Sequence, residues 1–346
     1  MEAAPEGGLF YWENQMERKT ALRLVDTRAL DRGQWLEVRK GGIGSSDAAA
    51  AVGLNPYKSQ LELWLEKTGR AESSGEHQSM NDPRFWGTLL EPYVAVAYQQ
   101  ITNRKVRKLN AVLQHPTLPF MLAKFDREVV GSPDVQILEC KTAGEFGSRL
   151  WKDGVPEYVQ LQVQHQLAVT GKAAADVAVL LCGQKLEVHR IERDDGVIAR
   201  LTVLESHFWS HVESDTPPRA DGSESAARAL RHLYRGNDAT LDFTGDADLG
   251  STFDALAALD EEIAAKEREA ERLKQAIQQA MGDASKAAFA NGVATFKRAK
   301  DGVRIDAKAL ATDHPDLAAR YTVTTPGSRR FLLARNTATA ERSATC

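Results

Sequence analysis

The segment from Phe120 to Ala143 constrains the fold of this chain most, because it predicts two β-strands joined by a tight polar turn. Apolar and β-branched residues lie on both sides of a Gly-Ser-Pro-Asp sequence at residues 131–134, and these residue types favour turns. Side chains alternate along a strand, so Glu139 and Lys141 share one face of the second strand, whose other face is apolar. A carboxylate and an ammonium are therefore expected side by side.

Asp126 adds a second carboxylate at the end of an apolar segment, and the strand–turn–strand can return it beside Glu139. Two such oxygen ligands hold a Mg²⁺ that lowers the pKa of a bound water and neutralises charge on a phosphodiester. Lys141 can orient the attacking water or help to deprotonate it. The pattern therefore predicts phosphodiester hydrolysis with Mg²⁺, or with Mn²⁺ in its place. The alternative is an exposed hairpin with a cross-strand Glu–Lys pair, since Glu-x-Lys tripeptides are common.

Composition limits the remaining possibilities. With 42% hydrophobic and 27% charged residues, the chain has an ordinary globular composition, and no apolar run is long enough to span a membrane. The N-terminus lacks the basic start and apolar core of a secretory signal, so we expect a cytoplasmic protein without a membrane partner. Three widely spaced cysteines support neither a disulfide framework nor a zinc site. A net charge of −4 means that any contact with DNA must come from local basic patches.

A glycine-rich turn upstream is a candidate phosphate site. A helix is predicted to end near Arg39, and a Gly-Gly-Ile-Gly turn follows it. Ser45, Ser46 and Asp47 are then expected to cap an alanine-rich helix over residues 48–52. Backbone N–H groups and hydroxyls gather at such a helix start and suit a phosphate, and Arg39 adds positive charge. The same residues also fit an ordinary N-cap on a core helix.

Two further helices carry candidate polar residues. Glu91 is predicted near the start of a helix that runs through Tyr98, as a surface residue favoured by the helix dipole or as a third metal-site carboxylate. Gln162 and Gln166 lie four residues apart in a helix predicted between Pro156 and Gly171, so they share one helical face. Their amides are expected either to hold waters or phosphate oxygens, or to be exposed to solvent.

The order of elements predicts an α/β (α+β) fold, in which a mixed sheet is flanked by helices and followed by a helical arm and a small α+β tail. The arm is predicted from a seven-residue spacing of apolar residues on a charged helix, and it either pairs subunits or packs on its own domain. Its spacing is carried by Leu256, Ile263, Ala270 and Ile277. The predicted parts are an N-terminal extension (1–30), a main domain (31–220), a linker and heptad helix (221–282) and a small basic region (283–346).

Several motifs occur in a set order between about Asp31 and His211. They are Arg39 with GGIGSSD, then NPY, WGTLLEP, MLAKFDREV, LECKTA and PEYVQLQVQHQLAVTG. The ordered set resembles the YqaJ-like viral recombinase family, the group that includes bacteriophage lambda exonuclease, within the PD-(D/E)xK nuclease superfamily. This resemblance implies a restriction-endonuclease-like core.

The resemblance also implies roles for individual residues. It identifies Asp126 and Glu139 as metal ligands, Lys141 as the lysine of the ExK strand, and Glu91 as a helix-borne acid of the same site. Gln162 matches the first Gln of the family's QxQ motif, and the backbone carbonyl of Cys140 would complete the metal coordination. Arg39, Ser45 and Ser46 match the region that holds the 5′-phosphate of the DNA strand being degraded.

The chain departs from the family pattern around the metal aspartate. The family usually has Asn-Leu-Asp-Gly there, whereas this chain has Lys124-Phe125-Asp126-Arg127. Asp134, in the literal Pro-Asp pair, is the competing candidate for the metal ligand, but it lies in the turn.

By resemblance, the expected activity is a Mg²⁺-dependent 5′→3′ exonuclease on linear double-stranded DNA. It would produce 3′ single-stranded ends for phage or prophage recombination, together with a single-strand annealing protein. A homo-oligomer, a ring-shaped trimer threaded by DNA, is expected as well. Two other functions stay open: a DNA-end-binding scaffold with little catalysis, and a restriction-type endonuclease, which would also cut closed circular DNA.

Overall fold

The computed structural model describes residues 20–71, 80–325, 327 and 329–335. It divides into two compact units, one that ends at Arg235 and one that begins at Gly236. Of the predicted N-terminal extension, residues 1–19 lie outside the described residues. Its remaining part contains β1 (Leu22–Asp26), which pairs with a strand of the first unit.

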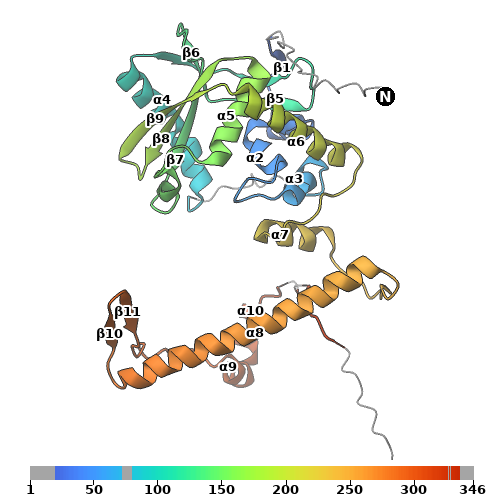
Figure 1. The fold of residues 1–346 in the computed structure, drawn as a ribbon, viewed down its shortest axis with the longest axis vertical. Coiled ribbons are helices and arrows are strands. Elements are labelled where there is room, and N and C mark those ends of the chain that lie inside the picture. The colour runs from blue at the N-terminus through green and yellow to red at the C-terminus, as the bar shows by residue number, and fades with distance from the viewer. Residues whose placement is uncertain (1–19, 72–79, 326, 328, 336–346) are drawn as a thin grey trace, which may run out of the picture. The chain divides into compact units, whose positions relative to one another are not determined.

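The first unit is built on a mixed five-stranded sheet (Figure 1). The strands follow the order β3-β6-β7-β8-β9, and only the β7–β8 pair is parallel. The predicted turn at residues 131–134 joins β6 to β7 as an antiparallel pair. The strands are β3 (Lys105–Arg107), β6 (Arg127–Val130), β7 (Ile137–Ala143), β8 (Ala174–Leu181) and β9 (Lys185–Glu192).

One helix packs on each face of this sheet. On one face, α4 (Pro83–Thr102) buries Tyr98 among side chains that include Leu138 of β7. On the other face, α5 (Glu157–Thr170) buries Val163 in a cluster that includes Ile137. Because neighbouring residues of β7 point to opposite faces, Glu139 falls on the α5 side with Ile137. The predicted fold class, a mixed sheet flanked by helices, is confirmed.

A second, four-stranded sheet has the order β1-β4-β5-β2, with β2 (Ile43–Gly44), β4 (Ala111–Gln114) and β5 (Met121–Ala123). The prediction of a single strand between Phe120 and Val130 was wrong, because the chain leaves this sheet after Ala123 and enters the five-stranded sheet at Arg127. Asp126 is the last residue of the crossing. The crossing gives that side chain a position that a continuous strand would not give it.

A second core of the first unit joins β2 to α2, α3, α6 and α7. This core joins Ile43, Trp64 and Phe208 and includes Ala229 of α7. Since α7 also packs along α3, the first unit continues past residue 220. The remaining helical segments of the first unit are α1 (Arg32–Lys40), the 3-10 helix η1 (Ser45–Asp47), α2 (Ala48–Ala51), α3 (Gln60–Lys67), the 3-10 helix η2 (Gly147–Trp151), α6 (Asp195–Glu213) and α7 (Glu224–Leu233).

The second unit contains the predicted helical arm and small elements after it. The arm is α8 (Ala247–Met281), a single helix of 35 residues. A hairpin of β10 (Lys286–Phe289) and β11 (Gly292–Thr295) follows, and then α9 (Ala307–Asp313) and α10 (Pro315–Tyr321). Across the described part of the chain, no helix combines the length and apolar character that crossing a membrane requires.

Candidate active site

Glu139 is the centre of a buried hydrogen-bonded group on the α5 side of the sheet. Its Oε1 accepts hydrogen bonds from Lys141 Nζ at 2.9 Å and from Gln162 Nε2 at 2.5 Å, and its Oε2 accepts one from Gln166 Nε2 at 2.8 Å. Lys141 Nζ also donates to Gln162 Oε1 at 2.9 Å. The alternation of β7 and the helical period of α5 thus bring together the four side chains that the sequence placed on two shared faces.

Asp126 lies next to this group, across the β6–β7 junction. Its Oδ2 accepts a hydrogen bond from the backbone N–H of Cys140 at 2.8 Å. Burial is the largest influence on this carboxyl and, together with the charges of Glu139 and Glu91, raises the pKa of Asp126 to about 7, although Lys141 and the Cys140 N–H act in the opposite direction. A bound cation would favour the ionised form of Asp126, whose charge its surroundings otherwise disfavour.

The pKa of Lys141 is also raised, which for an amine favours the charged form. Burial disfavours its charge, but the nearby carboxylates of Glu139 and Asp126 outweigh burial and raise the pKa of Lys141 above its ordinary value. At neutral pH the Lys141 side chain is therefore an ammonium that donates hydrogen bonds. This charge state suits the orientation of a water or the stabilisation of phosphate charge, and it does not suit a general base.

Glu91 is close enough to raise the pKa of Asp126, but it is bound elsewhere. Its Oε1 accepts a hydrogen bond from Arg127 Nη1 at 2.5 Å. Within the described ranges, no three His, Cys, Asp or Glu side chains gather closely enough to hold a metal ion. The structure therefore does not bring Glu91, Asp126 and Glu139 together as a three-carboxylate set, because Arg127 neutralises Glu91. Glu91 was predicted near the start of a helix, but it lies well inside α4, which begins at Pro83.

The candidate phosphate-binding residues surround a buried ion pair. Lys67 Nζ donates to Asp47 Oδ2 and to the backbone carbonyl of Arg39, both at 2.8 Å, and Arg39 Nη2 donates to Asp47 Oδ1 at 3.2 Å. Asp47 is the N-cap residue of the alanine-rich helix, as predicted, but its side chain makes no capping hydrogen bond and binds these two cations instead. That helix, α2, is also only four residues long. Ser45 has a buried Oγ without a hydrogen-bond partner among the described residues, whereas Ser46 is exposed.

Gly42 fixes the position of this turn. A Cβ at residue 42 would lie 2.5 Å from the backbone oxygen of Phe120 and 2.7 Å from the Leu122 side chain, so only glycine fits there. The close approach lets β2 pair with β5, with Ile43 N–H bonded to Phe120 O at 2.6 Å. Ser45 and Ser46 are thereby held beside the strand that leads to Asp126.

One cavity of about 260 Å³ is lined both by the group around Glu139 and by the candidate phosphate-binding residues. Every member of the hydrogen-bonded group around Glu139 lines this cavity except Gln166. The cavity wall includes the candidate metal-site residues Asp126, Glu139, Lys141 and Gln162. It also includes the candidate phosphate-binding residues Arg39, Ser45 and Ser46. Lys124 and Trp35 line it as well, and Lys124 Nζ lies 4.9 Å from the centroid of the Trp35 ring. The unusual Lys124 is thus held by an aromatic ring at the cavity wall.

The donor set of this cavity fits Mg²⁺. Asp126 and Glu139 supply the carboxylate oxygens that Mg²⁺ prefers, and this ion keeps several waters, so few protein ligands are required. The three hydrogen bonds to Glu139 leave lone pairs on its oxygens. In a strand, the N–H and C=O of one residue face the same neighbour, so the Cys140 carbonyl faces the side of Asp126, as its N–H does.

Comparisons with known proteins identify the family of this chain. A family model described as the YqaJ-like viral recombinase domain matches residues 34–173. The "Uncharacterized protein YqaJ" of Bacillus subtilis (strain 168) is 35% identical over 308 residues, which cover 87% of this chain and 94% of that protein. The chain belongs to the YqaJ-like viral recombinase family.

Solved structures are similar to this YqaJ-family chain over about half of its length. An alkaline exonuclease (LHK-Exo) from Laribacter hongkongensis has 25% identity and a TM-score of 0.45, over 53% of this chain and 93% of its own. A phage related exonuclease from Haemophilus somnus 129PT has 12% identity and a TM-score of 0.36, over 50% of this chain and 96% of its own.

All candidate site residues of the YqaJ-family chain lie inside the matched segment, residues 34–173. Asp134 is placed away from them, in an exposed turn where it pairs with Arg104 at 2.8 Å. The sequence placed Gln166 on the helical face of Gln162 without assigning it a role in the metal site, and it did not indicate Lys67 as a site residue. The four-residue spacing from Gln162 was the signal for Gln166, whereas nothing in the sequence indicated the contact of Lys67 with Asp47.

Proposed function

We propose that this YqaJ-family protein is a Mg²⁺-dependent exonuclease that degrades linear double-stranded DNA in the 5′→3′ direction. Family membership supports a nuclease role in recombination. In this proposal the products are 3′ single-stranded ends, which a single-strand annealing protein would take up. A ring of several copies around the DNA is part of the proposal by resemblance to the family, as is an origin in a phage or prophage.

The single observation that carries the proposal is the shared cavity. The side chains suited to hydrolysis and those suited to a phosphate line the same space of about 260 Å³. If Arg39, Ser45 and Ser46 hold a terminal phosphate there, the bond presented to Glu139 is near the end of the strand. This short separation favours removal of terminal nucleotides over cleavage within a duplex.

The chain's own groups would divide the work as follows. Asp126, Glu139 and the Cys140 carbonyl would hold the metal, which when bound supplies an activated water and neutralises phosphate charge. Lys141, as an ammonium, would hold the attacking water or a phosphate oxygen. Gln162 accepts from Lys141 and donates to Glu139, so it keeps the acid and the amine in a fixed relation.

The test is digestion of linear duplexes labelled at either end, with and without a 5′-phosphate, by the purified protein with Mg²⁺. We expect label at the phosphorylated 5′ end to be released first. Lys141→Ala and Asp126→Ala should each lower the rate by at least about 100-fold, as removal of a positioned catalytic group does. Tryptophan fluorescence would verify that both variants remain folded.

The outcomes separate the competing functions. Cleavage of covalently closed circular DNA would favour a restriction-type endonuclease. Tight binding of DNA ends without digestion at any Mg²⁺ or Mn²⁺ concentration would favour a scaffold. Digestion by both variants at the wild-type rate would reject the site itself.

A further inference from the structure

The arm α8 carries an apolar seam that the described residues leave open. Leu259, Ile263, Leu273 and Ile277 are exposed to 51%, 47%, 52% and 39%, although they follow the a and d positions of a heptad repeat. A row of exposed leucine and isoleucine on one stripe of a helix indicates an interaction surface.

Other parts of the second unit lie on a different side of α8. Ala257 is buried and Ala264 is half-buried, and Glu261 pairs with Arg335 at 2.6 Å. With Leu256 as an a position, these three residues occupy b and f positions, away from the seam. The seam therefore has no partner among the described residues of its own unit, and its regular heptads suit another helix.

The a and d side chains of α8 are complementary to those of a second α8 that runs in the opposite direction. When a second α8 runs antiparallel with its centre opposite residue 268, the a and d positions meet in four kinds of layer. These layers are Leu256 with Ala280, Leu259 with Ile277, Ile263 with Leu273, and Lys266 with Ala270. Two layers pair large apolar side chains, and the other two place a long side chain against alanine. The matched stretch, residues 256–280, is about 36 Å long at the rise of an α-helix.

Charge favours the same orientation. A parallel pair in register would place Lys266 against Lys266 in the core and Glu262 against Glu267 beside it, which are like charges, and would oppose them only with the pair of Glu269 and Lys274. The antiparallel pair places Asp260 against Lys274. Only near its centre do Glu267 and Glu269 approach their own copies, and Lys266, which lies 3.1 Å from Glu269 in its own helix, supplies positive charge there.

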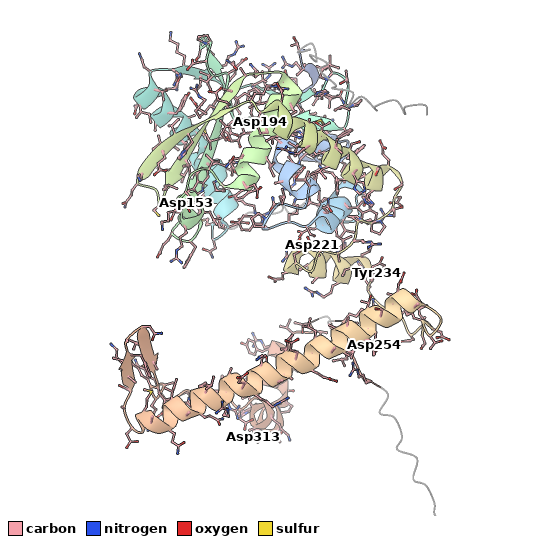
Figure 2. All side chains as sticks on the ribbon, in the orientation of Figure 1. Asp153, Asp194, Asp221, Tyr234, Asp254 and Asp313 are labelled. Carbon is pink, nitrogen blue, oxygen red and sulfur yellow. The ribbon has the colours of Figure 1, made fainter. Side chains whose placement is uncertain are left out.

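The ends of α8 differ in charge as well. From Asp248 to Glu262 the helix has only acidic charges, including Asp254 (Figure 2), whereas residues 263–281 carry four basic and three acidic side chains. An antiparallel partner sets the acidic half of one helix beside the basic residues of the other. We propose that α8 pairs antiparallel with α8 of a second copy of this chain, so that two copies, or two rings of copies, are joined through their arms.

The test is the mass of the full-length protein, measured by sedimentation equilibrium at several concentrations without DNA. Ile263→Glu and Leu273→Glu should each halve the mass at concentrations where the wild-type protein is paired. Ala265→Glu is the matched control, because it introduces the same charge at an exposed c position, and it should leave the mass unchanged.

Charge exchange tests the orientation. Asp260→Lys and Lys274→Asp should each raise the dissociation constant of the pair, and the double variant should restore it towards the wild-type value. A wild-type mass equal to that of Ile263→Glu would overturn the proposal. So would an unchanged mass with altered thermal stability, which would assign the seam to a segment of the same chain. Failure of the double variant to restore pairing would reject the antiparallel orientation.

Discussion

At the scale of single residues, the candidate site depends on how Glu139 is held. Three side chains donate to its two oxygens, and two of them, Gln162 and Gln166, come from one face of α5. Gln166 is fully buried, and its own Oε1 has no hydrogen-bond partner among the described residues. A buried polar side chain with a missing partner costs free energy, so its contact with Glu139 is the feature that explains its presence.

Gln166→Met is expected to weaken the binding of a divalent cation by about 10- to 100-fold, as loss of a group that orients a metal ligand does. Methionine has a similar length but cannot donate to Glu139 Oε2. The measurement is Mn²⁺ binding to the full-length protein by titration calorimetry. Gln164→Met is the matched control, since Gln164 lies on the same helix but bonds to Glu192 O and Asp194 N. Equal Mn²⁺ affinity of the wild-type protein and Gln166→Met would contradict this role.

The sequence predicted those residues of the site whose positions depend on local periodicity. Glu139 with Lys141 follows from strand alternation, and Gln162 with Gln166 follows from the helical period. The pairing of Glu91 with Arg127 was not predictable, because it joins α4 to β6 across 36 residues. The same holds for Lys67 and Asp47, which lie on separate short helical elements. Such contacts depend on how separate elements pack together, which the periodicity of the sequence does not predict.

At the scale of elements, α5 connects the site to the rest of the first unit through His165. This fully buried side chain bonds through Nδ1 to Glu205 Oε1 of α6 at 2.7 Å and through Nε2 to the Leu122 carbonyl at 2.9 Å. Burial opposes its charge, but Glu205 and the Leu122 carbonyl outweigh burial and raise the pKa of His165. With acceptors at both nitrogens, the ring is held as an imidazolium.

This raised pKa predicts how stability depends on pH. The folded state holds the His165 proton more tightly than the unfolded state, so the stabilisation is complete below the ordinary pKa of about 6.5 and is lost as pH rises through the folded value. The free energy of unfolding of wild-type protein should therefore exceed that of His165→Gln by more at pH 6 than at pH 9. Loss of one partner of a buried pair costs about 3–5 kcal/mol.

Urea unfolding followed by tryptophan fluorescence measures this difference, because all six tryptophans precede Gly236 and so report the first unit alone. His207→Gln, at an exposed position of α6, is the control for a loss of histidine that leaves the buried pair intact. A difference between wild type and His165→Gln that stays constant from pH 6 to pH 9 would exclude a charged His165.

Element types followed from the sequence more readily than element boundaries. The β6–β7 hairpin and the helix α5 agree with the predicted strands, turn and helix. The crossing between sheets at Lys124–Asp126 was missed, since β5 and β6 read as one apolar run and only tertiary pairing separates them. That break matters for function, because it places Asp126 at the cavity.

At the scale of the whole molecule, the chain joins a unit that carries the candidate site to a unit that carries the seam. The similarity to YqaJ of Bacillus subtilis extends over 308 residues, which is more than the first unit contains, so it reaches into the second. In the proposals above, the first unit hydrolyses DNA and α8 joins copies. Removal of the second unit should therefore separate the two activities.

A fragment that ends at Arg235 keeps every candidate site residue and both cores of the first unit. Its midpoint of thermal unfolding, followed by tryptophan fluorescence, should lie within about 2–4 °C of the full-length value, which corresponds to a change below about 1 kcal/mol. It should also digest short linear duplexes with Mg²⁺. A fragment that is folded but no longer digests DNA would show that the second unit contributes to the site.

A second fragment, ending at Ala220, tests where the first unit ends. It lacks α7, whose Ala226 and Ala229 are buried and whose Ser225 Oγ accepts a hydrogen bond from the Ser59 N–H at 2.8 Å. Removal of α7 exposes the Trp64 core and leaves Ser59 without this partner, so this fragment should unfold at a lower temperature than the one ending at Arg235. Equal midpoints for the two fragments would place the end of the cooperative unit at residue 220, as the sequence predicts, and would make α7 part of the connection to α8.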